Sequence, residues 1–252
     1  LLPNAVTDIL YNGELALVSG REGTVAVLSG KVRCAPPSAQ ELTHRLGVVG
    51  LRYQLGHHRD EFGPSEVALP EIDAPWAVQV GADSFCQASE QANRAMRRAV
   101  AAALDFAGSV DRACELYAGA GNFTDLLLRR AGQVTAVERD VAACASLARA
   151  AESAGWAGKL RVLQGDVAAE LRSATTADLC LLDPGRPGAP EFAQALGRSG
   201  PRHLVYVSCA FDTLARDAKA LAGVGFAPLQ ATVVDAFAWT VHAEAIVLFG
   251  RG

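Results

Sequence analysis

The chain has 252 residues, of which 50% are hydrophobic, so it can bury a sizeable core in one large or two small domains. No uninterrupted apolar run reaches membrane-spanning length, and the first residues do not have the basic-then-apolar pattern of a signal peptide. The net charge of −4 argues against a coat of nucleic-acid-binding charge, although it permits a local basic surface. Six cysteines without CxxC spacing indicate a reduced, cytoplasmic protein.

Residues 1–80 have the pattern of a small β-rich domain. Strand-like runs at 14–18 and 24–28 flank the stretch 20–23, which predicts a hairpin connection. Prolines between positions 36 and 75 then divide the segment into loops and short strands. A basic and imidazole cluster lies here: Arg52, His57, His58 and Arg59. Adjacent strand residues point to opposite faces, so a solvated loop is favoured over a metal site for the two histidines.

From residue 87 the hydrophobic period becomes helical. An Ala-rich helix is predicted over 87–106, with one apolar stripe. Arg94, Arg97 and Arg98 can project from it as a basic ridge. A solvated charged face is the default interpretation of such a ridge, and phosphate contact is the minority one.

Strands and helices then alternate. Expected strands cover 113–117, 134–137, 160–163, 179–182 and 204–207, and expected helices cover 123–130, 141–153, 167–172 and 213–222. This alternation predicts a mostly parallel sheet with helices on both faces. Two closing β runs, 229–235 and 243–249, have no helix between them and predict an antiparallel hairpin at one edge. The predicted fold class is therefore α/β, with a Rossmann-like domain over 81–252 after the β-rich domain.

Polar elements follow four successive strands. The turn 115–122 is rich in glycine, which lets the backbone approach a ligand closely. Glu138 ends the next strand, where a carboxylate can accept hydrogen bonds from both ribose hydroxyls of a nucleoside. Asp166 is placed to reach an adenine amine, and the loop 183–189 presents Asp183 over the sheet edge. Each element alone could be a cap or a turn. Together they predict a site for S-adenosylmethionine, because no pyrophosphate cradle is complete.

Residues 203–209 form an apolar, β-branched run that ends in Ser208-Cys209. The cysteine therefore stands where a strand leaves the sheet, at the edge where open α/β folds bind ligands. A buried structural role is favoured about three to one for a lone cysteine. The cofactor elements and the carboxylate of Glu244 on the closing hairpin reverse that preference. Four other cysteines lie in strand or helix patterns and keep the structural interpretation: Cys86, Cys114, Cys144 and Cys180.

Together these motifs resemble the RNA 5-methyluridine methyltransferases, a class I family that methylates C5 of uridine in tRNA or rRNA. The matching pieces run in family order: Phe85-Cys86-Gln87, 115–124, Val137-Glu138, Gly165-Asp166, 182–188, 205–209 with 213–217, and 240–244. They span about residues 85 to 250, and their combination is specific where any single motif would not be.

The resemblance implies an S-adenosylmethionine-dependent enzyme acting on RNA, with rRNA slightly preferred over tRNA. It implies that Cys209 is the nucleophile that adds to uracil C6 and that Glu244 is the general base at C5. It also implies a set of cofactor-binding residues: Gln87, Tyr117, Gly119, Gly121, Asn122, Glu138, Asp166 and Asp183. We expect no metal, no membrane contact and a monomer.

The chain departs from the family after the nucleophile. Ala210-Phe211 stands where Asn-Pro is usual, and Gly185 stands where proline is commoner. The oligonucleotide-binding barrel and the iron–sulfur cysteines of some family members are not visible. Two alternatives stay open: methylation of cytosine C5 or another acceptor, and a non-catalytic RNA- or cofactor-binding module. The altered residues after Cys209 and the acidic net charge motivate the second alternative.

Overall fold

The computed structural model describes residues 4–70, 72, 75–87, 89–196, 200–236, 240 and 243–251. The chain forms two compact units, one of Leu1–Pro70 with Ala77–Cys86 and one of Glu71–Trp76 with Gln87–Gly252. The separate roles predicted for 1–80 and 81–252 stay a prediction. Within the described ranges, no helix is long and apolar enough to cross a membrane.

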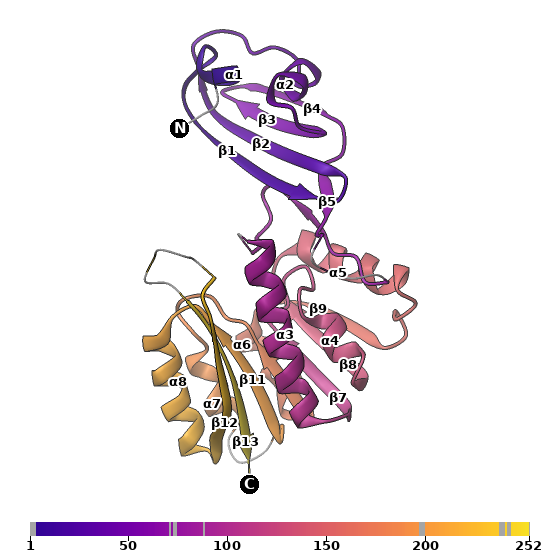
Figure 1. Ribbon diagram of the computed structural model, residues 1–252, viewed down its shortest axis with the longest axis vertical. Coiled ribbons are helices and arrows are strands. Elements are labelled where there is room, and N and C mark those ends of the chain that lie inside the picture. The colour runs from indigo at the N-terminus through magenta and orange to yellow at the C-terminus, as the bar shows by residue number, and fades with distance from the viewer. Residues whose placement is uncertain are drawn as a thin grey trace. The chain divides into compact units, whose positions relative to one another are not determined.

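The first unit is built on a four-stranded sheet in the order β1-β2-β3-β4 (Figure 1). β1 (Leu10–Gly20) and β2 (Gly23–Val32) form the predicted hairpin. β3 (Gly50–Leu55) runs parallel to β2, and β4 (His58–Phe62) is antiparallel to β3. A separate two-stranded ladder joins β5 (Glu66–Ala68) to β6 (Gln79–Gly81). The β-rich character of this unit is confirmed.

One face of this sheet is covered by α1 (Asn4–Thr7) and α2 (Ala39–Leu46), where only loops and strands were predicted. The Ser38 hydroxyl caps α2 by accepting a hydrogen bond from the Glu41 N–H at 3.2 Å. Gly47 ends the helix in the left-handed region, at φ 66°. Ser-x-x-Glu is the sequence pattern of a capping box, so a readable helix signal was missed. The helix also provides the crossover that parallel strands need.

The second unit contains a seven-stranded sheet in the order β12-β13-β11-β10-β7-β8-β9. Its parallel strands are β7 (Val110–Leu116), β8 (Ala131–Glu138), β9 (Leu160–Gln164), β10 (Leu179–Leu182) and β11 (His203–Ser208). β12 (Phe226–Val234) and β13 (Glu244–Arg251) form the predicted antiparallel hairpin at one edge, with β13 beside β11. The predicted α/β class is confirmed.

Helices cover both faces of this sheet. α6 (Val167–Thr175), α7 (Pro190–Leu196) and α8 (Phe211–Gly223) share one apolar core with alternate strand residues such as Leu182 and Tyr206. On the other face lie α3 (Glu90–Ala107), α4 (Thr124–Leu128) and α5 (Val141–Ser153), and Figure 1 shows α3 in front of the sheet. α7 was not predicted, and α8 begins two residues earlier than predicted.

The structure separates the cysteines by environment. Cys114 of β7 and Cys180 of β10 are fully buried and lie opposite each other on these paired strands. The Cys144 thiol donates a hydrogen bond to the Glu138 carbonyl at 3.4 Å. Cys86 lies in an irregular segment, so its assignment to a strand or helix pattern was wrong. Cys209 is half-buried and directly follows β11.

Candidate active site

Strand registers bring the predicted residues to one edge of the large sheet. The parallel ladders align the last residues of β7, β8 and β10 at the same level. Tyr117 and Asp183 follow the first and the last of these strands, and Glu138 ends β8. Because the carboxyl ends of parallel strands meet at one edge, these three side chains are neighbours along it.

Cys209 and Glu244 stand opposite each other at the end of an antiparallel ladder. β11 and β13 pair Ser208 with Ala245, so the next position on each strand is the cysteine and the glutamate. Glu244 is 5% exposed, whereas Cys209 is half-buried. The ladder therefore places a thiol beside a buried carboxyl at the carboxyl edge.

Burial and the charge of Glu244 shift the pKa values of the groups at this point. Burial, and then the charge of Glu244, raise the pKa of Asp183 to about 7. Burial raises the pKa of Glu244, and burial with the Glu244 charge raises the pKa of the Cys209 thiol, which Arg186 partly offsets. In the described chain, no hydrogen-bond donor reaches the Asp183 or the Glu244 carboxyl. Two carboxyls that titrate closer to neutrality than usual can accept and release protons beside a thiol.

The loop after Asp183 is tied to the start of α8 through a buried carboxylate. Asp217, 3% exposed, accepts hydrogen bonds at 2.7 Å from the Tyr206 hydroxyl and from the Ala189 N–H. A Cβ on Gly188 would lie 2.5 Å from the Asp217 carboxylate, and Gly188 has φ +74°. Glycine is therefore required there by both space and backbone conformation. These contacts fix the loop against the helix that follows Cys209.

The Ala210-Phe211 departure lies at the first turn of α8. Ala210 is the N-cap residue with extended backbone, and it makes no side-chain cap hydrogen bond. The Ser208 hydroxyl accepts from the Ala210 N–H at 3.1 Å, and the Thr213 hydroxyl donates to the Arg186 carbonyl at 3.0 Å. The helix therefore begins two residues after Cys209, without the asparagine cap and N1 proline that favour a helix start.

The glycine-rich turn between β7 and α4 has three residues with positive φ: Tyr117 at 62°, Gly119 at 55° and Gly121 at 103°. A Cβ added to Gly119 would meet nothing within 4 Å, so this turn faces open space. Both oxygens of Glu138 are held by backbone N–H groups, one by Gly119 at 2.9 Å and the other by residues 139 and 140 at 2.7 and 2.8 Å. Its carboxylate is therefore a fixed acceptor beside the turn.

Residues distant in sequence hold this turn in place by hydrogen bonds. The Trp76 indole N–H donates to the Gly121 carbonyl at 3.0 Å. Asn93 and Asn122 exchange two amide hydrogen bonds of 2.8 Å, so the Asn122 side chain supports the turn. Arg97 donates to the Asn122 carbonyl and to both Asp125 oxygens at 3.0 Å. Arg97 is only 9% exposed, so the prediction that it lies on a solvated ridge was wrong.

Glu115 lies below the turn and was not predicted as part of the site. It is 1% exposed, accepts from the Thr124 hydroxyl at 2.5 Å, and is near enough to Asp183, Asp125 and Arg97 to feel their charges. Burial raises its pKa to about 8, so it is largely neutral at pH 7. An acidic residue inside a strand with hydrophobic neighbours was the available sequence signal.

The remaining predicted residues are placed at the margins. Exposed Asp166 caps α6, accepting from the Ala168 N–H at 2.8 Å. Gln87 is half-buried in the segment before α3. The Tyr117 hydroxyl donates to Glu191 of α7 at 3.1 Å. Val241 and His242 of the closing motif lie outside the described residues. Among those described, no group of three or more His, Cys, Asp or Glu could hold a metal.

The order of the strands, the carboxylate beside the glycine-rich turn and the antiparallel closing hairpin define a class I methyltransferase fold. The Pyrococcus abyssi tRNA (uracil-54, C5)-methyltransferase, solved with S-adenosyl-L-homocysteine, has a TM-score of 0.73 and 19% identity, over 92% of this chain and 58% of that one. A tRNA m1G37 methyltransferase from M. jannaschii has a TM-score of 0.60 and 12% identity, over 100% of this chain and 79% of that one. At such identities the likeness concerns the fold alone.

Comparison with curated protein sequences shows the family. Proteins named 23S rRNA (uracil(1939)-C(5))-methyltransferase are 30% identical over 262 residues in Klebsiella pneumoniae, covering 98% of this chain and 58% of that protein. The one from Pseudomonas putida is 38% identical over 186 residues, covering 71% of this chain and 40% of that protein. The chain belongs to the class I RNA uracil-C5 methyltransferase family, and it spans about half the length of these relatives. No protein-family model matches it.

Proposed function

We propose that this chain methylates C5 of uracil in RNA, with S-adenosylmethionine as methyl donor and ribosomal RNA as the preferred substrate. The observation that carries the proposal is the thiol of Cys209 facing the buried Glu244 carboxyl across the β11–β13 ladder, beside Asp183. The curated relatives are named as 23S rRNA enzymes, which supports ribosomal RNA over tRNA. The free cysteines suit the reducing cytoplasm.

The residues along the cofactor edge fit S-adenosylmethionine. Gly119 opens onto empty space, and Glu138 is fixed beside it as an acceptor for ribose hydroxyls. Tyr117, Gly121 and Asp183 stand around the same opening, while the support of Asn122 keeps the turn in shape. When bound, the cofactor would supply an electrophilic methyl group on a sulfonium.

The chain's own residues account for the activation of the base. The Cys209 thiolate would form a bond to uracil C6, which moves an electron pair towards C5 and makes that carbon nucleophilic. After C5 has taken the methyl group, Glu244 would remove the C5 proton. The C6–sulfur bond then breaks and restores both the uracil double bond and the thiolate. The target base must leave its stack to reach such a site, at a cost of a few kcal/mol.

Trapping the adduct tests this proposal. Glu244→Gln should accumulate a covalent RNA–protein species, visible as a shifted band on a denaturing gel, because the carboxylate that removes the proton is gone. Cys209→Ala should abolish methyl transfer and leave cofactor affinity intact. Cys86→Ala is the matched control and should methylate like the wild type. Unchanged methylation in Cys209→Ala would refute the mechanism.

A further inference from the structure

An aromatic side chain is turned outward by an irregularity in the first unit. The β1–β2 register shifts between Leu10 and Asn12, so Tyr11 is the extra residue of a β-bulge. Bulges re-aim a side chain away from the regular alternation of a strand. Tyr11 is 71% exposed, the exposure of a residue that adds nothing to the core. Its ring is therefore available to a partner.

Arg33 holds a fixed position on that ring. The Arg33 guanidinium carbon lies 6.0 Å from the centre of the Tyr11 ring, a cation–π arrangement. The Arg33 Nε donates to the Leu10 carbonyl at 2.9 Å, which orients the guanidinium. The two residues thus form a preorganised pair of flat groups next to each other.

Further cations gather at the same end of the sheet. Arg59 of β4 is paired with Gln54 of β3, which is paired with Ser29 of β2, so these three side chains share one face. Lys31 lies on the same face, two residues after Ser29. The turn after β3 is attached to β2 by the Gly56 N–H donating to the Gly30 carbonyl at 2.8 Å. The exposed His57 of this turn therefore lies near the same strand end.

These cations are not neutralised locally. Among the residues that the structure describes, no carboxylate is within ion-pair distance of Lys31, Arg33 or Arg59. Nearby Asp60 accepts from the Ala39 N–H at 2.7 Å, and Asp8 is 3.9 Å from Arg45. Two exposed acidic residues share this face: Glu14, opposite Ser29, and Glu61, two residues after Arg59 on β4.

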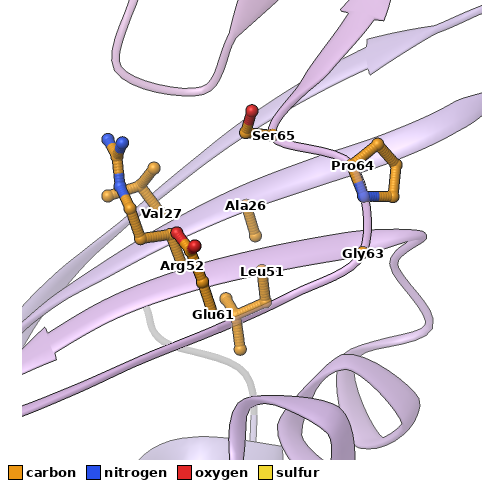
Figure 2. Close-up of a pocket in the computed structure, with 8 residues that line it drawn as sticks. All are labelled: Ala26, Val27, Leu51, Arg52, Glu61, Gly63, Pro64 and Ser65. Atoms are coloured by element: carbon orange, nitrogen blue, oxygen red, sulfur yellow. The ribbon is translucent and has the colours of Figure 1, made fainter.

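The next positions along this face, two residues away on β2, β3 and β4, differ. A small pocket there, drawn in Figure 2, has Arg52 and Glu61 on paired positions, and Arg52 also forms an ion pair with Asp83. The rest of its lining is mostly apolar or small: Ala26, Val27, Leu51, Gly63, Pro64 and Ser65. Arg52 therefore has acidic partners, whereas Lys31, Arg33 and Arg59 form no ion pair with any residue that the structure describes.

We propose that Tyr11, Lys31, Arg33 and Arg59 form a platform for single-stranded RNA, on which a base stacks against Tyr11 and Arg33 while the cations contact phosphates. Exposed aromatics on sheets with neighbouring cations are how single strands are bound without sequence readout. This inference rests on the proposed function, because it takes RNA as the substrate. The platform would hold a segment of the RNA other than the target uracil.

The test is the affinity for a fluorescein-labelled oligouridine strand, measured by anisotropy over a range of salt concentrations. Tyr11→Ala should weaken binding roughly five- to hundredfold, the loss typical of one stacked base. Tyr11→Phe should bind like the wild type, since it keeps the ring. Arg33→Ala should weaken binding through the lost stacking contact, whereas Lys31→Ala and Arg59→Ala should each lower the salt slope by about 0.7, the value for one lost phosphate contact with a single strand.

Matched controls are Phe62→Ala for an exposed aromatic and Arg45→Ala for an arginine on α2. Both should bind as the wild type does, and thermal unfolding should show all variants folded. RNA affinity unchanged in Tyr11→Ala and Arg33→Ala would overturn the platform, even if the wild type methylates RNA. Tyr11-dependent RNA binding by a chain that transfers no methyl group would uphold the platform and refute the proposed function.

Discussion

The two halves of the site treat their carboxyl groups differently. In the cofactor half, at the ends of β7 and β8, Glu138 is saturated by three backbone N–H groups. In the catalytic half, at the ends of β10, β11 and β13, Asp183 and Glu244 receive no donor from the described residues, and burial raises the pKa of both. A carboxylate held by fixed partners has one orientation and can orient a ligand, whereas an unpartnered one with a raised pKa can exchange a proton.

The halves also differ in what supports them. The cofactor turn is supported from outside its own motif by Trp76, Asn93 and Arg97. The loop after Asp183 is supported by Tyr206, Thr213 and Asp217, which belong to the same stretch as Cys209. The cofactor half therefore depends on tertiary contacts with α3 and Trp76, and the catalytic half on residues close in sequence to Cys209. Substitutions can therefore remove the hydrogen bonds of one half without changing those of the other.

Arg97→Met should have the largest effect, on the cofactor half. It leaves the buried Asp125 without its main partner and frees the Asn122 carbonyl, which should cost about 3–5 kcal/mol of unfolding free energy. Arg129, at 3.6 Å from Asp125, places the expected loss at the low end. Calorimetry should also show weaker cofactor binding. Arg94→Met removes an exposed pair on the same helix and should cost under about 1 kcal/mol.

Glu115→Gln tests the buried carboxyl between the two halves of the site through the pH dependence of folding stability. The wild-type pKa is about 8 in the folded chain and about 4.3 unfolded, so folding takes up a proton between these values. Wild-type stability therefore falls as pH rises from about 4 to about 8. Glutamine can still accept from Thr124 without ionising. Denaturant titrations should give equal stabilities near pH 4 and a variant more stable by about 2–4 kcal/mol at pH 8. Equal stabilities at both pH values would contradict the buried neutral acid.

Tyr206→Phe acts on the catalytic half alone. It removes one of the hydrogen bonds to buried Asp217 and should cost about 1–3 kcal/mol. The loop carrying Asp183 would lose part of its attachment to α8, so turnover should fall while the cofactor dissociation constant stays unchanged. Weakened cofactor binding with normal turnover would contradict the separation of the two halves.

Ala210→Asn should give the smallest change, and a favourable one. Asparagine at the N-cap can accept from the N–H groups of the first turn of α8, which Ala210 cannot. The expected gain is about 0.5–1 kcal/mol in urea titrations. Ala210→Ser is a second capping variant and should show the same sign. A loss of stability in both would mean that α8 does not start at Phe211.

The sequence predicted the parts of the fold that depend on local pattern. Apolar runs and their alternation with helices identified the sheet, and the strand ends identified Cys209, Asp183 and Glu138. The role of Arg97 could not be read locally, because an arginine on an Ala-rich helix has a solvated face as its default and only tertiary packing buries it against Asp125. α2 was missed although Ser38 and Glu41 carry a cap signal, since the surrounding prolines suggested loops.

The central claim is that the edge holding Cys209 and Glu244 methylates uracil at C5. Nucleoside mass spectrometry of RNA incubated with the chain and methyl-labelled S-adenosylmethionine tests this claim most directly. The account predicts labelled 5-methyluridine with the wild type and none with Cys209→Ala. Labelled 5-methylcytidine in its place, or cofactor binding without any labelled nucleoside in total RNA, would contradict it.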